Sequence, residues 1–131
     1  MTQEQEELLL KDLCARLPYG VKCVSGVDDA TLIIEGINPN CCGASEVQVT
    51  YERSGINFDT TISAIKPYLF PLSSMTEEQK EEHKDLLDNQ YSFDANGSIF
   101  TLQDFYNKYH LDYRGLIPMG LADDAIGKNI Y

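Results

Sequence analysis

The sequence contains no tryptophan, only two histidines, and ten lysine and arginine residues against 21 aspartate and glutamate residues. The formal net charge is therefore −11. Affinity for nucleic-acid backbones comes largely from basic side chains that neutralise phosphates, and anionic membranes attract the same side chains. The charge balance thus argues against direct nucleic-acid binding and against a membrane surface. It favours solubility and a partner with a basic surface.

Long apolar runs are missing too, because no stretch approaches the roughly 18 residues that a membrane span requires. The N-terminus reads MTQEQEELLLKDLC, with acidic residues where a secretory signal has a basic region. Its apolar run, Leu8–Leu10, is too short to direct export. We therefore expect a cytoplasmic protein.

Recognisable catalytic and cofactor motifs are also lacking. Neither GxGxxG nor GxxxxGK[ST] occurs, so no motif indicates a dinucleotide fold or a P-loop. The cysteines form no CxxC pair, and neither histidine stands at zinc-finger spacing from a cysteine pair. The sequence therefore predicts no enzyme, no cofactor and no metal site.

The four cysteines are expected to be reduced thiols, because the chain carries no export signal. Cys14 falls in a helical pattern and Cys23 in a strand pattern, so both are interpreted as small core residues. The adjacent pair Cys41-Cys42 would be redox active only if exposed, and we expect it to be inert.

The length of 131 residues with 43% hydrophobic residues supports one core, so we expect a single domain over residues 1–131. Residues 1–2 and about 123–131 are expected to be loosely ordered. The first element is a helix over about residues 3–17, because Thr2 and Gln5 form a capping box. Its expected apolar stripe comprises Leu10, Leu13, Cys14 and Leu17.

Residues 21–62 change to short β-rich runs separated by turn residues. Four strands are predicted: Val21 to Val24, Thr31 to Ile37, Glu46 to Tyr51, and Ile56 to Ile62. Their short connections favour an antiparallel meander. Residues 64–75 contain two prolines and are interpreted as a connector laid across the core, not as a central strand.

The remaining residues predict two to three helices. The first covers about residues 75–88, with Ser73 or Ser74 as its cap, and has so few apolar residues that most of it must be solvated. Asn96-Gly97 marks a turn, and Thr101 with Asp104 starts a helix that runs to about His110. The fold class is α+β: an N-terminal helix packed on a meander of about four strands, followed by the C-terminal helices.

The acidic helix is the first candidate site. Glu77 and Glu81, like Glu78 and Glu82, are four residues apart and share a helix face. Acid–base or metal chemistry would need a recessed site, whereas this helix is too polar to be recessed. The glutamates are interpreted as a solvated face, and in functional terms as a patch that contacts a basic partner.

The second candidate site is the cluster His110, Asp112, Tyr113 and Arg114. No serine or cysteine nucleophile stands at a recognisable turn, so the cluster has no assigned chemistry. In the structural interpretation, Asp112 caps the last helical turn, Tyr113 packs in the core and Arg114 pairs with a carboxylate. Tyr113 and Arg114 are also the favoured binding surface, because tyrosine and arginine are enriched at binding hot spots.

Three stretches resemble a family of small uncharacterised proteins found in gut Bacteroidales genomes, phages and prophages. They are LLLKDLCARLPYGVKC at 8–23, IKPYLFPLSSMTEEQK at 65–80 and HLDYRGLIPMGLA at 110–122. The family more often has an arginine at the position of Phe70, and its tail commonly reads GLALEAP where this chain has GLADDA. The resemblance carries over no activity or catalytic residue. It implies an accessory protein of a mobile element that acts inside a bacterial host.

Two functions remain open. The first is a non-enzymatic regulatory protein that binds a host cytoplasmic protein, through Glu77, Glu78, Glu81, Glu82, Tyr113 and Arg114. The alternative is a small-ligand or nucleotide-binding protein with a pocket between the sheet and the aromatic C-terminal helix, lined by Tyr106, Tyr109, His110 and Arg114. The sequence leaves the oligomeric state open.

Overall fold

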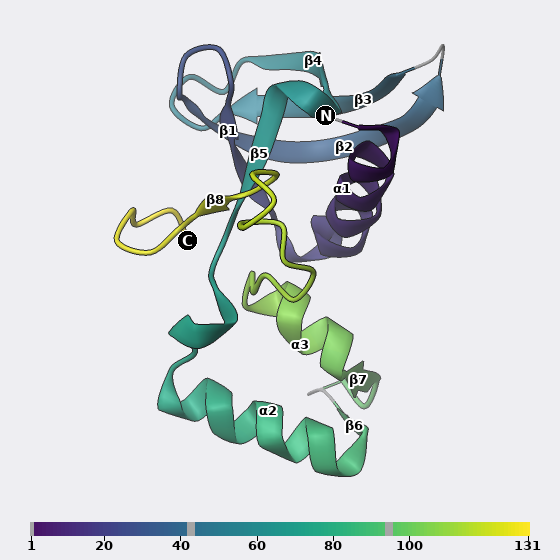
Figure 1. Cartoon of the computed structure of the whole chain (residues 1–131), viewed down its shortest axis with the longest axis vertical. Coiled ribbons are helices and arrows are strands. Elements are labelled where there is room, and N and C mark those ends of the chain that lie inside the picture. Colours follow the sequence, from purple (N-terminus) through teal and green to yellow (C-terminus); the bar gives the residue numbers. More distant parts are fainter. Residues whose placement is uncertain (1, 42–43, 94–95) are drawn as a thin grey trace.

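The computed structural model describes residues 2–41, 44–93 and 96–131, which form a single α+β domain (Figure 1). The chain begins with α1 (Gln3–Arg16), followed by β1 (Lys22–Ser25), β2 (Thr31–Cys41), β3 (Ala44–Tyr51), β4 (Asn57–Thr61) and β5 (Ile65–Leu69). It continues with α2 (Glu77–Asn89), β6 (Tyr91–Phe93), β7 (Ile99–Thr101), α3 (Leu102–Lys108) and β8 (Asp123–Asp124). Short 3₁₀ turns lie at Leu17–Tyr19, Ile62–Ala64 and Leu72–Ser74. The predicted fold class is confirmed.

The main sheet has six strands in the order β4-β3-β2-β1-β5-β8. β1, β2 and β3 each pair with the next strand in sequence in antiparallel fashion, which confirms the predicted meander. β5 adds to the free side of β1, and β8 pairs with β5 in parallel. β2 extends beyond the predicted end at Ile37, through Asn38-Pro39-Asn40 to Cys41, with a register irregularity between Asn38 and Cys41.

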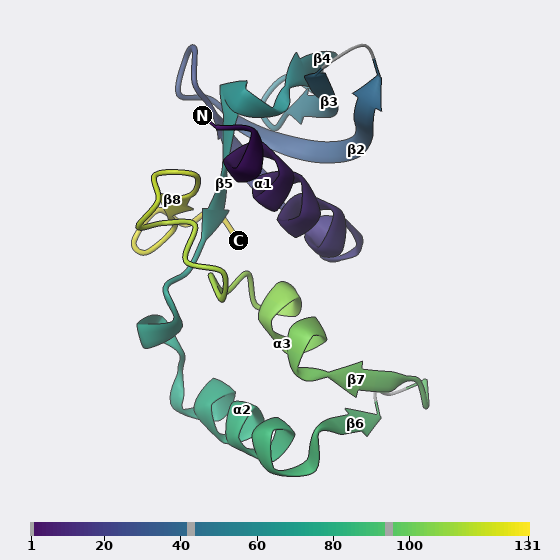
Figure 2. The same ribbon diagram turned by 45° about the vertical axis from the view of Figure 1, so that its right-hand side comes forward.

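α1 covers one face of the sheet (Figures 1 and 2), and its predicted capping box is present. The expected apolar stripe is wrong in part, because Cys14 is exposed. Leu13 is buried, and Leu10 and Leu17 are partly buried against the core, as predicted. The fully buried residues of the helix are Leu9, Asp12, Leu13 and Arg16. The leucines join the large core against the sheet. Asp12 and Arg16 are charged residues on the same buried face of the helix.

The interpretation of residues 64–75 as a connector is wrong for its first part, because Ile65–Leu69 is a strand that contains Pro67. Gly26 N–H donates to the Ala64 carbonyl, so the alternation of an antiparallel ladder turns Lys66 N–H toward β1 and the Pro67 nitrogen away from it. On that other side β8 pairs only with Tyr68 and Leu69. Pro67 therefore sits where a strand needs no donor.

Residues 77–93 and 96–108 form a lobe of two helices and a two-stranded hairpin below the sheet (Figure 2). Leu86, Phe105 and Leu111 form its small buried cluster, separate from the large core. α2 begins at Glu77 with Thr76 as its cap, not at Ser73 or Ser74 as predicted, because the Thr76 hydroxyl accepts from Gln79 N–H. α3 starts after Thr101 as predicted. The hairpin of β6 and β7 was not predicted as strands.

The C-terminal residues make more contacts than the expected loose tail. Besides the pairing of β8, the Tyr131 hydroxyl accepts from Lys22 N–H at 2.9 Å and donates to the Tyr68 carbonyl at 3.0 Å. The Tyr131 ring stacks on His110, with centroids 3.6 Å apart. These contacts tie the last residue to β1 and β5. Among the described residues, no helix has the length and apolar character needed to cross a membrane.

Candidate functional site

The acidic face of α2 is solvated, as the sequence indicated. Glu77, Glu78 and Glu81 are exposed, and only Leu86 of this helix is buried. Glu77 pairs with Lys80 at 3.3 Å on the surface, which is a weak interaction at such exposure. Glu82 is half-buried and accepts a hydrogen bond from the Tyr109 hydroxyl at 2.9 Å. The exposed carboxylates are therefore accessible to a basic surface, whereas Glu82 joins α2 to α3.

An apolar patch lies on the hairpin that follows α2. Tyr91, Phe93 and Ile99 are 51%, 65% and 63% exposed. Tyr91 and Phe93 are two residues apart in β6, and Ile99 is directly opposite Phe93 in β7, so the three side chains share one face. The Tyr91 and Phe93 rings contact edge to face, with centroids 5.8 Å apart. We call these three residues the hairpin patch.

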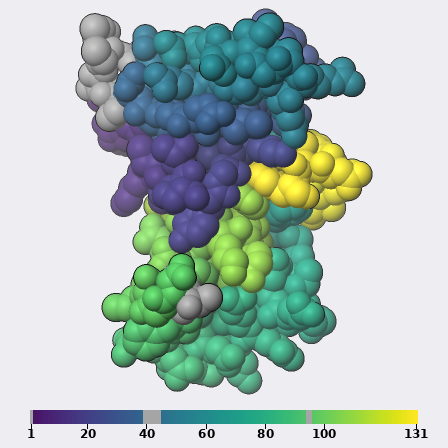
Figure 3. Space-filling model, turned by 180° about the vertical axis from the view of Figure 1, so that it is seen from behind, coloured from purple at the N-terminus to yellow at the C-terminus, as the bar shows by residue number. Residues whose placement is uncertain are grey.

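The opposite face of the hairpin anchors it to the lobe. Phe100 is half-buried and packs against the cluster of Leu86, Phe105 and Leu111. The hairpin patch is therefore held in place by Phe100 and turned to solvent. Seen from behind, the hairpin and α2 form one end of the molecule, with α1 and the sheet at the other (Figure 3). The acidic face and the hairpin patch thus belong to the same lobe.

Tyr113 and Arg114 do not join this surface, because they contact α1 and α3. Arg114 Nε donates to Asp12 Oδ1 at 3.1 Å, and Arg16 Nε donates to Asp12 Oδ2 at 2.8 Å. The Asp12 and Arg16 side chains are 0% exposed and that of Arg114 is 13% exposed. Arg16 Nη2 also donates to the Leu111 carbonyl at 2.6 Å. One buried carboxylate thus binds two guanidinium groups and ties α1 to residues 111–114.

Tyr113 is half-buried at this ion network. The guanidinium carbons of Arg16 and Arg114 lie 5.4 and 4.8 Å from its ring centroid, and its ring stacks on Tyr106 at 4.9 Å. The structural interpretation of Arg114, pairing with a carboxylate, is confirmed. That of Asp112 is wrong: its carboxylate accepts from Leu116 and Ile117 N–H, so it orders the turn that follows it.

The residues of the alternative ligand site point to different neighbours. The Tyr106 hydroxyl lies 2.9 Å from His83 Nε2, and the Tyr109 hydroxyl binds Glu82. His110 stacks on Tyr131, and Arg114 binds Asp12. Burial, with a smaller contribution from the nearby cations Arg16 and Lys22, lowers the pKa of His110 to about 4. His110 is therefore neutral at physiological pH.

One pocket does reach Tyr109. It has a volume of about 320 Å³ and is lined in part by Phe70, Tyr109, Leu111 and Ile126. Tyr106, His110 and Arg114 do not line it. The alternative site therefore contributes one of its four residues to an apolar pocket between the end of β5, the start of α2 and the C-terminal tail.

The two described thiol side chains differ in burial. Cys23 is buried in the core, and burial raises the pKa of its thiol to about 12, whereas Cys14 is exposed. Cys42 and the side chain of Cys41 lie outside the part of the chain that the structure describes. The expectation that this pair is inert therefore stays a prediction. Within residues 2–41, 44–93 and 96–131, no three histidine, cysteine or acidic side chains gather in a way that could hold a metal ion.

Sequence reasoning missed the hairpin patch and the buried ion network. A signal existed for the first, because Tyr91, Phe93 and Ile99 flank the Asn96-Gly97 turn, the arrangement of a β-hairpin. A weaker signal existed for the second, because Asp12 and Arg16 are four residues apart in a helix. Nothing in that spacing distinguishes a buried pair from an exposed one.

Comparison of the chain with models of known families, with curated proteins and with solved structures gives no significant match. The resemblance to proteins of gut Bacteroidales and their phages therefore stays a prediction, and the function is argued from the site alone.

Proposed function

We propose that this chain is a non-enzymatic binding protein that docks onto a host protein through the α2–hairpin lobe. The observation that carries the proposal is the hairpin patch, three large apolar side chains on one exposed face beside an acidic helix. Exposed aromatic groups with a polar rim are typical of protein interaction sites. The partner surface is apolar at its centre and basic at its border, because the net charge is −11 and the glutamates of α2 are exposed.

The two parts of the surface have different roles. Burial of the hairpin patch would supply affinity, since aromatic side chains dominate binding energies at interface centres. The glutamates would steer the approach of a basic partner, so the association rate falls as salt increases. The resemblance to phage and prophage proteins supplies the context, a partner inside the bacterial host cell.

The test is affinity capture by N-terminally tagged protein from nuclease-treated lysate of a gut Bacteroidales strain. The proposal expects one stoichiometric host protein that Phe93→Ser/Ile99→Ser no longer retains and that Glu77→Lys/Glu81→Lys retains less at low salt. The matched controls are Val27→Ser, an exposed apolar residue in the turn after β1, and Glu4→Lys/Glu7→Lys on α1. Equal loss in the controls, or full retention by both lobe variants, contradicts the proposal.

A second candidate function is the binding of a small apolar molecule, and the pocket lined by Phe70, Tyr109, Leu111 and Ile126 favours it. A ligand present at about 100 times its dissociation constant stabilises a protein by roughly 2.7 kcal/mol, which a thermal shift assay detects. An aliphatic or aromatic ligand that raises the melting temperature of wild type, but not of Ile126→Gln, a change at an exposed lining residue, supports this candidate. No shift across such a panel contradicts it.

A further inference from the structure

β4 (Asn57–Thr61) is an outer strand of the main sheet, and within the described part of the chain it pairs only with β3, on its inner side. Tyr51 N–H donates to the Ile56 carbonyl at 3.0 Å, which fixes the alternation of the ladder. The backbone groups of Phe58 and Thr60 therefore point toward β3. Those of Asn57, Asp59 and Thr61 point outward, and no described residue pairs with them.

This edge has little of the protection that outer strands usually carry. Proteins blunt such edges with proline, lysine, bulges or a covering segment. β4 reads NFDTT, which contains no proline and no lysine, and Asp59 is its one charged residue. Its pairing with β3 is regular over all five residues. The opposite edge of the sheet, by contrast, ends in β8, which has only two residues. β4 is thus long and regular enough to accept another strand.

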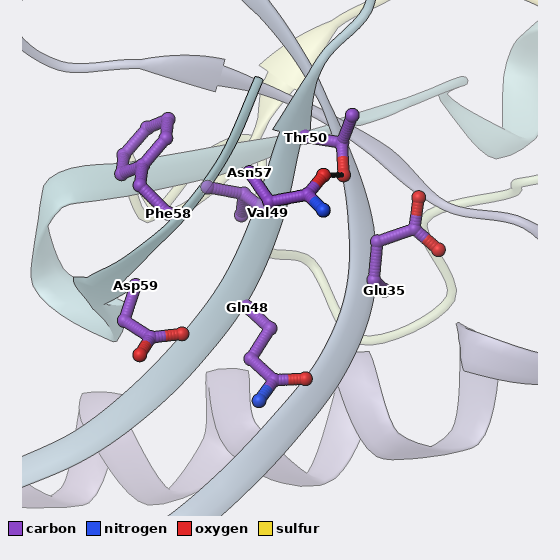
Figure 4. Close-up of a pocket in the computed structure, with 7 residues that line it drawn as sticks. All are labelled: Glu35, Gln48, Val49, Thr50, Asn57, Phe58 and Asp59. Atoms are coloured by element: carbon purple, nitrogen blue, oxygen red, sulfur yellow. Dashed lines mark hydrogen bonds between the residues drawn. The ribbon is translucent and has the colours of Figure 1, made fainter. Parts of the chain in front are cut away.

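The two faces beside the edge differ in chemistry. On the face turned away from α1, Asp59 lines a shallow pocket of about 340 Å³ together with Glu35, Gln48, Thr50 and Asn57 (Figure 4). On the other face, Phe58 is half-buried against Tyr51, with ring centroids 5.0 Å apart. A strand added to β4 would continue both faces, with its side chains alternately beside Asp59 and beside Phe58.

Charge decides between the two kinds of strand that fit. A second copy of this chain, paired through β4, would bring another chain of charge −11 and a second Asp59 to the same edge. Like charges across a strand pair are destabilising, whereas opposite charges stabilise it. We propose that the β4 edge binds an extended segment of a partner protein in which lysine or arginine alternates with apolar residues. This surface is separate from the hairpin patch, so the two proposals succeed or fail independently.

The test uses a defined probe, the fluorescein-labelled heptapeptide TKVKVKT, titrated with the full chain and followed by fluorescence anisotropy. Saturable binding is expected, and Asp59→Lys should weaken it by about tenfold, since it converts a cross-strand attraction into a repulsion. Asp88→Lys, an equal change of charge on exposed α2, is the matched control and should weaken it by less than about threefold. Failure to bind, or equal loss in both variants, overturns the proposal.

Two further measurements separate strand addition from simple charge attraction. Two peptides are compared: one is methylated on the backbone nitrogens of the lysines, the other on those of the residues between them. Both keep their charge, but each loses the backbone N–H donors on one edge of the added strand. Only one of the two should bind wild type, because an added strand uses alternate N–H groups. Amide exchange at Asp59 should slow with the peptide while that at Phe58 stays unchanged. Equal binding of both methylated peptides overturns the proposal, as does a dimer of wild type that Asp59→Lys dissociates.

Discussion

Replacement of Asp12 by asparagine tests the buried ion network. The side chain keeps its volume, so no cavity forms and only charge and hydrogen bonding change. Two guanidinium groups, those of Arg16 and Arg114, then lose their shared carboxylate while Arg16 stays 0% exposed. Removal of one partner from a buried ion pair costs about 3–5 kcal/mol, because the remaining charge is left uncompensated. We expect Asp12→Asn to lower the free energy of unfolding by that amount.

That loss is a large share of the ~5–15 kcal/mol that stabilises an ordinary domain. For a chain of this length each kcal/mol moves the melting temperature by roughly 3–4 °C, so the variant should melt roughly 9–20 °C below wild type. Urea unfolding followed by far-ultraviolet circular dichroism suits the assay, because the chain has no tryptophan. The matched control is Asp85→Asn on the exposed face of α2, which should change stability by less than about 0.5 kcal/mol.

A double variant distinguishes the loss of charge pairing from destabilisation that any substitution at this site would cause. Asp12→Leu/Arg16→Met removes the carboxylate and the fully buried cation together, and leaves Arg114 close enough to the surface to reach water. We expect it to be at least about 1 kcal/mol more stable than Asp12→Asn. A loss below about 1 kcal/mol in Asp12→Asn, or a double variant less stable than the single one, would refute the reasoning.

Three other predictions concern a helix cap, a histidine and two thiols. Thr76→Ala removes the cap of α2 and should lower the free energy of unfolding in urea by about 1 kcal/mol. Ser73→Ala should leave it unchanged, and a larger loss in Ser73→Ala than in Thr76→Ala would show that the cap is misplaced. His110 takes up a proton near pH 6.5 when unfolded but only near pH 4 when folded, so stability should fall as the pH drops from 6.5 to 4. His110→Asn, which tolerates the positive φ of that position, should show a smaller fall in urea midpoint over this range, and an equal fall would contradict the assignment. With Cys41 and Cys42 replaced by serine, the thiol reagent DTNB should label exposed Cys14 in the native protein and Cys23 only after unfolding; rapid native labelling of both would contradict the burial of Cys23.

Local patterns sufficed to predict most elements of the fold. The capping box at Thr2, the alternation in residues 46–51 and the cap at Thr101 each depend on neighbours in the sequence, and the structure confirms them. Elements that depend on distant residues were missed. Whether Pro67 can occupy a strand depends on where β8 begins, and β8 lies more than fifty residues along the chain.

The candidate site divides in the same way. The solvated glutamates of α2 follow from the composition of one helix and were predicted. The burial of Asp12 and Arg16 was not, because it depends on Arg114 and the Leu111 carbonyl, about 100 residues away. The expected stripe of α1 omitted Asp12 and Arg16 for this reason: hydrophobicity alone cannot indicate that charged residues occupy a buried face.

The separation of the interior into two hydrophobic clusters has a consequence for cooperativity. Among the residues that the structure describes, the cluster beneath α2 has three buried members, whereas the one beneath α1 has fourteen. Native-state hydrogen exchange should therefore find α2 and the hairpin opening as a unit at lower free energy than the sheet. The same segment carries the proposed docking surface, so a bound partner would suppress this opening. Its affinity would then include the free energy of closing the lobe, and variants that loosen Leu86 or Phe105 would weaken binding without touching the partner.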